Sequence, residues 1–146
     1  MLRGSYPARI DDKGRLKIPT AFKALVEDRH GADVYVTSVT GESVRIYPMA
    51  IWLAIEDRLR AMPSTHPARL KFLDRVSYYG QMGEFDGQGR VLIHPRLRDV
   101  AGMNGDVDVL GQVDYLEVWN HERLLAKIQG DPFTENDARG LAEFGI

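Results

Sequence analysis

The sequence predicts an α+β fold in which two copies of one small unit pack about a pseudo-two-fold axis, forming a closed or interleaved β-structure surrounded by short helices. The first observation is an internal repeat, because residues 11–18 (DDKGRLKI) recur in register as residues 86–93 (DGQGRVLI). The second is that each copy has only about four short strands with one apolar face, which is marginal as an isolated sheet. Two copies packed together bury both faces, so the repeat determines the architecture.

Each copy is expected to run strand, tight turn, strand, short helix, strand, turn, strand, helix. In the first copy, residues 6–10 form a strand and Gly14 supplies the positive φ that a tight turn needs. Residues 15–18 alternate polar and apolar, as a half-buried strand does. Its apolar residues face the core, so Arg15 and Lys17 share the opposite face.

The remaining elements follow from turn and cap residues. Pro19 ends the strand and starts a helix that Gly31 terminates, and strands at 34–36 and 44–47 flank Thr40-Gly41. Pro48 stands in the first turn of the next helix. The second copy repeats this plan with a helix ending at Gly102, strands at 107–109 and 116–119, and Asn120 as a helix N-cap.

Breaks in the repeat set the expected organisation of the chain. We expect a first repeat (1–62), a linker with a bridging helix around 70–76 (63–76), a second repeat (77–130) and an acidic C-terminal tail, helical around 135–144 (131–146).

Charge is unevenly distributed along a chain whose net charge is −2. Residues 1–30 carry seven Lys or Arg against four Asp or Glu, whereas residues 131–146 carry four acids against one Arg. This asymmetry indicates a basic working face and a solvated acidic tail. The chain has no cysteine, no apolar run long enough for a membrane span and no apolar signal core near its start, so we expect it in the cytoplasm.

The repeated Asp-x-x-x-Arg turn is the candidate functional feature. Arg15 and Arg90 each follow a tight turn and present a planar fork of donors suited to phosphate or to guanine edges. Asp11 and Asp86 stand across the hairpins, where a carboxylate can orient the guanidinium or cap the turn. The residues alone leave open whether these turns bind a ligand or are surface salt bridges that a duplication has copied.

No pattern for catalysis, a cofactor or a metal is evident. The four histidines are scattered, Gly87-Gln88-Gly89 lacks the spacing of a nucleotide loop, and no Gly-x-Ser-x-Gly is present. An arginine four residues after Asp11 and Asp86 lowers the pKa of each carboxyl, which spoils it as a general acid. We therefore expect no enzymatic activity, no cofactor and no small-molecule substrate. Trp52 and Trp119 are expected in the core.

Several segments together resemble the MraZ family of bacterial transcriptional regulators: the start Met1-Leu2-Arg3-Gly4, the two turns, Gly14 to Pro19, and Leu110-Gly111-Gln112 before Leu116-Glu117-Val118-Trp119. The resemblance covers about residues 1–130. It implies a swapped-hairpin barrel of the SpoVT/AbrB type. It also implies a DNA-binding regulator of the division and cell-wall gene cluster, located at the nucleoid. Such a protein forms ring-like homo-oligomers on short tandem repeats in its own promoter.

The family motif carries over onto Asp11 and Arg15 and onto Asp86 and Arg90. The arginines are expected to contact phosphates or bases, and the aspartates to hold them in place. The full set expected at DNA is Asp11, Lys13, Arg15, Lys17, Asp86, Arg90 and Arg96. Because Lys17 has Leu92 as its counterpart, the first turn is expected to be the more basic one.

Two rivals remain at this stage. One is an antitoxin of the same barrel class, whose acidic tail wraps a toxin. The other is an oligomeric scaffold whose turns make protein contacts. Retention on DNA at moderate salt separates a DNA-binding protein from the scaffold.

Overall fold

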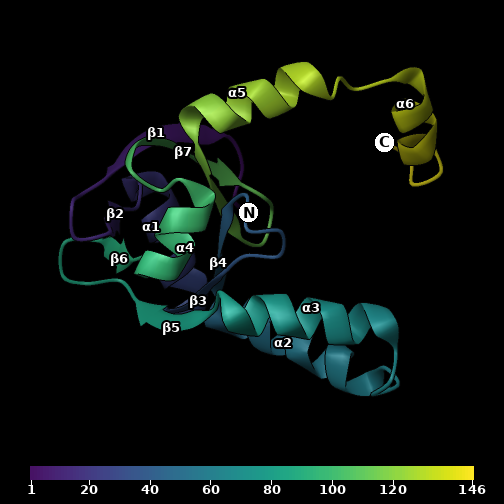
Figure 1. The fold of residues 1–146 in the computed structure, drawn as a ribbon, viewed down its shortest axis with the longest axis horizontal. Coiled ribbons are helices and arrows are strands. Elements are labelled where there is room, and N and C mark those ends of the chain that lie inside the picture. Colours follow the sequence, from purple (N-terminus) through teal and green to yellow (C-terminus); the bar gives the residue numbers. More distant parts are fainter.

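Strands from the two halves of the chain interleave in a single antiparallel sheet of eight strands, which curls into a nearly closed barrel in the computed structural model (Figure 1). All residues from 1 to 146 are described. The strands are β1 (Ser5–Ile10), β2 (Arg15–Lys17), β3 (Asp33–Thr37), β4 (Val44–Pro48), β5 (Gln81–Glu84), β6 (Arg90–Leu92), β7 (Gly105–Gly111) and β8 (Leu116–Asn120). The helices are α1 (Thr20–His30), α2 (Met49–Ala61), α3 (Pro67–Tyr78), α4 (Pro95–Ala101), α5 (His121–Gly130) and α6 (Glu135–Ala142).

The strand order β5-β3-β4-β8-β7-β1-β2-β6 is that of two interleaved copies. Strand β1 pairs with β7 just as its counterpart β5 pairs with β3. Two pairs, β2–β6 and β4–β8, join a strand to its own counterpart, so the pseudo-two-fold axis passes through them. Leu16 lies opposite its repeat partner Val91 on that axis. The predicted swapped-hairpin barrel is therefore confirmed.

A core of 20 buried residues fills the barrel and draws on both copies. Leu16 and Ile18 are 0% and 1% exposed, and their partners Val91 and Ile93 are 1% and 0% exposed. The alternation predicted for residues 15–18 is correct, because Arg15 and Lys17 lie on the outer face. Since neither copy has a covered face of its own, interleaving is what removes these side chains from water.

Helices α2 and α3 form a hairpin that projects from the barrel (Figure 1). Trp52 stacks on Tyr35 with 4.6 Å between ring centroids. The hydroxyls of Tyr35 and Thr37 both donate to the carbonyl of Val76, at 2.9 and 2.8 Å. These contacts tie the end of α3 to strand β3, and they place Trp52 in a second small core, as expected.

The bridging helix α3 is longer than predicted. It starts at Pro67, a residue preorganised for a first helical position, and the His66 ring accepts a hydrogen bond from the Ala68 amide at 3.1 Å. Gly31 and Gly102 end α1 and α4, and Asn120 caps α5, as predicted. Pro48 is not in the first turn of α2 but closes strand β4 immediately before it.

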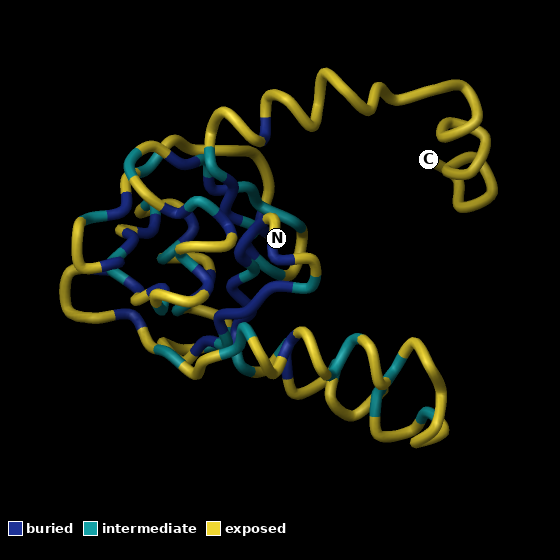
Figure 2. Tube along the Cα trace, in the orientation of Figure 1, coloured by how far each residue is buried: buried dark blue, intermediate teal, exposed yellow.

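The C-terminal segment leaves the barrel along α5 and ends in α6, which stands clear of it (Figures 1 and 2). Thr134 and Asp137 form a reciprocal capping box at the start of α6. The helix ends at Ala142, slightly before the predicted end at 144.

None of these helices combines the length and the apolar character needed to cross a bilayer.

We predict that Gly80→Ala destabilises the junction between α3 and β5. An added Cβ meets the Tyr35 hydroxyl and the Val76 carbonyl oxygen, so the hairpin anchor has to shift. Overpacking of this kind costs about 1–3 kcal/mol, which chemical denaturation measures. Gly87→Ala is the matched control, because a Cβ there meets nothing within 4 Å. Equal stability of the two variants would contradict the role of the Tyr35 and Thr37 contacts with Val76 in holding the hairpin to the barrel.

Candidate nucleic-acid interface

One carboxylate organises the first turn. The Oδ1 atom of Asp11 accepts hydrogen bonds from the amides of Lys13 and Arg15, at 3.0 and 2.9 Å. Its Oδ2 atom accepts from the Nε of Arg15 at 2.7 Å. Gly14 has a φ of 84°, which allows the chain to reverse under the carboxylate. Asp11 therefore folds the turn and orients the arginine at once.

The second turn has the same geometry. Asp86 Oδ1 accepts from the amides of Gln88 and Arg90 at 2.8 and 2.9 Å, and Oδ2 accepts from Arg90 Nε at 2.9 Å. Gly89 has a φ of 73°. The duplicated sequence thus produces two turns with the same hydrogen bonds, each of which holds its arginine in the same orientation.

Both carboxyl groups are held ionised. The backbone amide of Arg15 is the largest of the causes that lower the pKa of Asp11. The backbone amide of Arg90, with further help from Gln88 and the Arg90 side chain, lowers the pKa of Asp86 to about 2. The sequence predicted that the pKa of each aspartate is lowered, and it attributed the lowering to the charge of the neighbouring arginine. The backbone amides of the turns contribute more to this lowering than that charge does. The carboxylates act as acceptors and do not serve as general acids near neutral pH.

The two turns are joined into one surface. The Ile18 amide donates to the Gly89 carbonyl at 3.0 Å, and the Ile93 amide donates to the Gly14 carbonyl at 2.8 Å. Between them, β2 and β6 pair in register across the axis. Each turn is therefore fixed by backbone hydrogen bonds to the strand that follows the other.

The register of this ladder changes the expected charge balance. Lys17 lies directly opposite Arg90, and Arg15 lies opposite Leu92. Lys17 therefore adds positive charge to the second turn as well as to the first, because it is the cross-strand neighbour of Arg90. Two cations facing each other on a ladder weaken it slightly.

Each turn arginine keeps most of its donors free. The side chains of Arg15 and Arg90 are 35% and 26% exposed, and each gives only its Nε–H to the neighbouring aspartate. The terminal nitrogens make no hydrogen bond within the protein. A guanidinium held at one edge in this way presents the other edge to a phosphate or a base.

Two further cations at the turns were missed as site residues. The Lys23 side chain of α1 lies over Gly89, and the Arg98 side chain of α4 lies over Gly14, each within 3 Å of where a Cβ would stand. Each repeat therefore covers the turn of the other. The Nε of Arg98 is enclosed without an acceptor. The sequence shows that Lys23 and Arg98 are repeat partners, so both could have been predicted as site residues. Only the interleaving of the two copies shows which turn each side chain covers.

The remaining predicted residues lie differently. Lys13 is exposed at the tip of the first turn. Arg96 is joined to neither turn; its guanidinium lies 4.3 Å from the Tyr78 ring centroid and donates to the Tyr78 carbonyl at 3.2 Å. The structure therefore brings together Asp11, Arg15, Lys17, Asp86 and Arg90, and places Arg96 at the end of α3.

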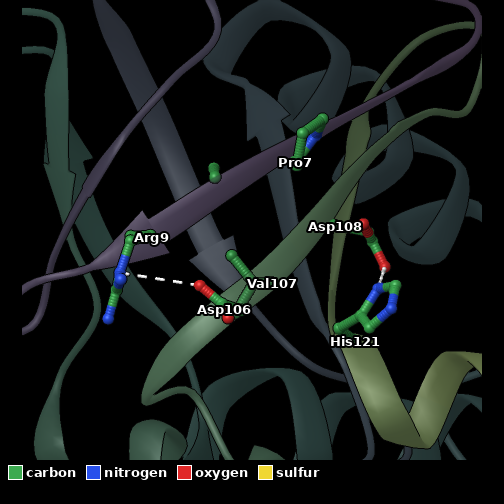
Figure 3. A pocket seen from close by; sticks show the side chains of 7 residues that line it. Pro7, Arg9, Asp106, Val107, Asp108 and His121 are labelled. Atoms are coloured by element: carbon green, nitrogen blue, oxygen red, sulfur yellow. Dashed lines mark hydrogen bonds and ion pairs between the residues drawn. The ribbon is translucent and has the colours of Figure 1, made fainter.

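A separate open pocket of about 360 Å³ lies between β1, β7 and the start of α5 (Figure 3). Its charged groups are paired with one another. Arg9 lies 3.6 Å from Asp106, and His121 lies 2.7 Å from Asp108. No serine or threonine hydroxyl lines this pocket beside the histidine.

We predict that Asp86→Asn removes part of the acid sensitivity of folding. A carboxyl whose pKa falls from 3.8 to about 2 on folding stabilises the native state above pH 4, and this contribution is lost as the pH falls through 2. The denaturation midpoint of the parent should therefore drop more steeply between pH 4 and 2 than that of the variant. Asp12→Asn, whose carboxylate accepts no hydrogen bond, is the control and should follow the parent. A parent-like slope in Asp86→Asn would refute the assigned role.

Comparison with known proteins identifies relatives over the whole chain. The family model described as "MraZ protein, putative antitoxin-like" matches residues 1–75 and 81–144. A protein of Acidobacterium capsulatum is 47% identical over 146 residues, and one of Koribacter versatilis is 48% identical over 147 residues, with full coverage of each chain. A protein of Escherichia coli is 30% identical over 141 residues, covering 96% of this chain and 93% of that one. All three are named transcriptional regulator MraZ, and the chain described here belongs to the MraZ family.

Proposed function

We propose that this chain is a transcriptional regulator that binds double-stranded DNA through the outer face of the β2–β6 ladder and the two turns beside it. The observation that carries the proposal is the register of that ladder. It brings Arg15, Lys17 and Arg90 onto one exposed surface, while the aspartates hold both arginines in place. The names of the relatives support regulation as the class of activity.

The residues have distinct roles in this proposal. Arg15 and Arg90 contact phosphates or guanine edges with their free terminal nitrogens. Lys13 and Lys17 contact phosphates, which adds affinity without sequence preference. Asp11 and Asp86 stay ion-paired and fix the arginine rotamers, so little side-chain freedom is lost on binding. Arg96, beside Tyr78, contacts the DNA backbone at the margin of the site.

Lys23 and Arg98 extend this surface. They lie over the turn glycines, so their positive charge stands beside both arginines. Three of the cations have acid partners, since Lys23 pairs with Glu27, Arg15 with Asp11 and Arg90 with Asp86. Lys13, Lys17 and Arg98 have no carboxylate partner, and this excess of positive charge raises the local concentration of a polyanion and speeds association. The net charge of −2 does not oppose this, because residues 1–130 carry 18 Lys or Arg against 17 Asp or Glu and the excess of acids lies in the tail.

We further propose that the protein acts as a homo-oligomer on short tandem repeats in the promoter of its own division and cell-wall gene cluster, at the nucleoid. The two repeats, 1–62 and 77–130, contribute one turn each to a single reading face per chain. The linker, 63–76, and the tail, 131–146, remain outside that face. Adjoining protomers then engage adjacent DNA repeats, which raises avidity without new contacts.

We predict that Arg15→Ala weakens binding to upstream DNA by about 10- to 100-fold, the loss expected for one bidentate contact. The thermal midpoint should move by no more than about 2 °C, because Asp11 still accepts the turn amides. Electrophoretic mobility shift and thermal scanning measure the two effects. Arg29→Ala, an exposed arginine in the last turn of α1, is the matched control. Loss of the fold together with binding would show that Arg15 is structural, and a parent protein that does not stay on DNA at moderate salt would favour the scaffold.

We also predict that affinity rises by about 100-fold or more from duplexes with one repeat to duplexes with three repeats at fixed spacing. Binding should weaken steeply as salt rises, because several phosphates are neutralised together. Titration of matched duplexes at two salt concentrations tests both points. Equal affinity for one, two and three repeats would contradict joint binding by an oligomer.

A further inference from the structure

The C-terminal arm, residues 131–146, has no covering surface in the chain that carries it. Every one of its residues is exposed (Figure 2). Helix α6 has eight residues and a complete capping box, so its conformation is locally encoded. A helix this short is nevertheless marginal in water without packing. The arm therefore gains no stabilisation from packing within its own chain.

The arm carries an apolar patch within an acidic segment. Phe133, Phe144 and Ile146 are 70%, 79% and 80% exposed, and Leu141 is 38% exposed. Phe133 and Leu141 line the same hollow, so they lie on one side of the arm. Four acids against one arginine surround them. Exposed apolar residues gathered in this way mark a protein-binding surface.

A groove with the opposite character lies on the α2–α3 hairpin. Its volume is about 320 Å³, and it is lined by Ile55, Leu59, Met62, Ala68 and Phe72 together with Arg58 and Arg69. Arg58 has no carboxylate partner, and the hairpin as a whole carries five Lys or Arg against three Asp or Glu. The groove is thus an apolar slot with a basic rim.

We propose that the arm of one copy docks in the α2–α3 groove of a second copy. Phe133, Leu141 and Phe144 enter the slot, and the acids of the arm meet Arg58 and its basic neighbours. The positive sign of the hairpin and the negative sign of the arm select this pairing over a second arm or a second groove. In Figure 1 the arm and the hairpin of one chain stand apart, so the arm does not cover its own groove.

Arm and groove are different surfaces, so the contact is head-to-tail. Such contacts build rings when the rotation closes and filaments when it does not. Strands β2 and β6 lie at the end of the barrel opposite the hairpin and the arm (Figure 1), so assembly leaves the turns free for DNA. The inference rests on the self-association in the proposed function but not on its DNA contacts.

Complementary variants of the full chain test the contact. Leu141→Glu with Phe144→Glu disables the arm, and Leu59→Glu disables the groove. Arg58→Glu repeats the groove test at an exposed position where folding is not at stake. Leu70→Glu, an exposed residue of α3 outside the groove, is the control. Sedimentation velocity gives the assembly state, and thermal scanning shows that each variant is folded.

We expect the parent and Leu70→Glu to form higher assemblies, and the arm and groove variants each to sediment as monomers. Mixing the two variants should restore one arm–groove contact and no more, giving a 1:1 dimer. The arm variant should bind a single DNA repeat as tightly as the parent, but should lose the gain on three repeats. Assemblies that persist in both variants would overturn the arm–groove contact while leaving self-association intact. A monomeric parent would overturn both.

Discussion

The backbone exchange between the two turns is the constraint on which the rest of the structure depends. Ile18 and Ile93 each donate an amide hydrogen bond to the glycine of the other turn, at 3.0 and 2.8 Å. Because of this exchange, β2 and β6 pair on the axis, the barrel core closes, and the arginines share one face. Gly14 and Gly89 adopt the positive φ that lets each chain reverse at this point, and a side chain at either position would also collide with a covering cation.

Placing both copies in one chain allows the axis to be asymmetric. In a dimer of identical chains, a residue on the axis faces itself. Here Arg45 faces its repeat partner Glu117, with 3.6 Å between nitrogen and oxygen, and Ser43 donates to the same carboxylate at 3.0 Å. Two copies in one chain can therefore place opposite charges at a pair of positions that would carry identical residues in a dimer of identical chains. The outer face of β2–β6 shows the same freedom, because Lys17 has Leu92 as its counterpart. A symmetric barrel thus presents an asymmetric surface.

Much of the fold could be predicted because it is encoded locally and twice. The 75-residue spacing, the turn glycines and the alternation in residues 15–18 indicated the repeat, the hairpins and the buried face. The opposition of Lys17 and Arg90 could not be predicted from their neighbours in the chain, because it follows from cross-copy register. The same holds for Lys23 and Arg98, which cover turns of the opposite repeat. The groove on α2–α3 depends on how two helices pack, which spacing along either helix does not specify.

In the function that we propose, the two turns of one chain form a single DNA-reading face. Calorimetric titration of a one-repeat duplex into the parent, Arg15→Ala, Arg90→Ala and the double variant tests it most directly. We expect one repeat bound per chain, a similar loss of affinity for either single substitution, and only salt-sensitive nonspecific binding for the double variant. Two repeats bound per chain, or parent-like affinity in Arg90→Ala, would show that the turns act separately and that no single face reads the DNA.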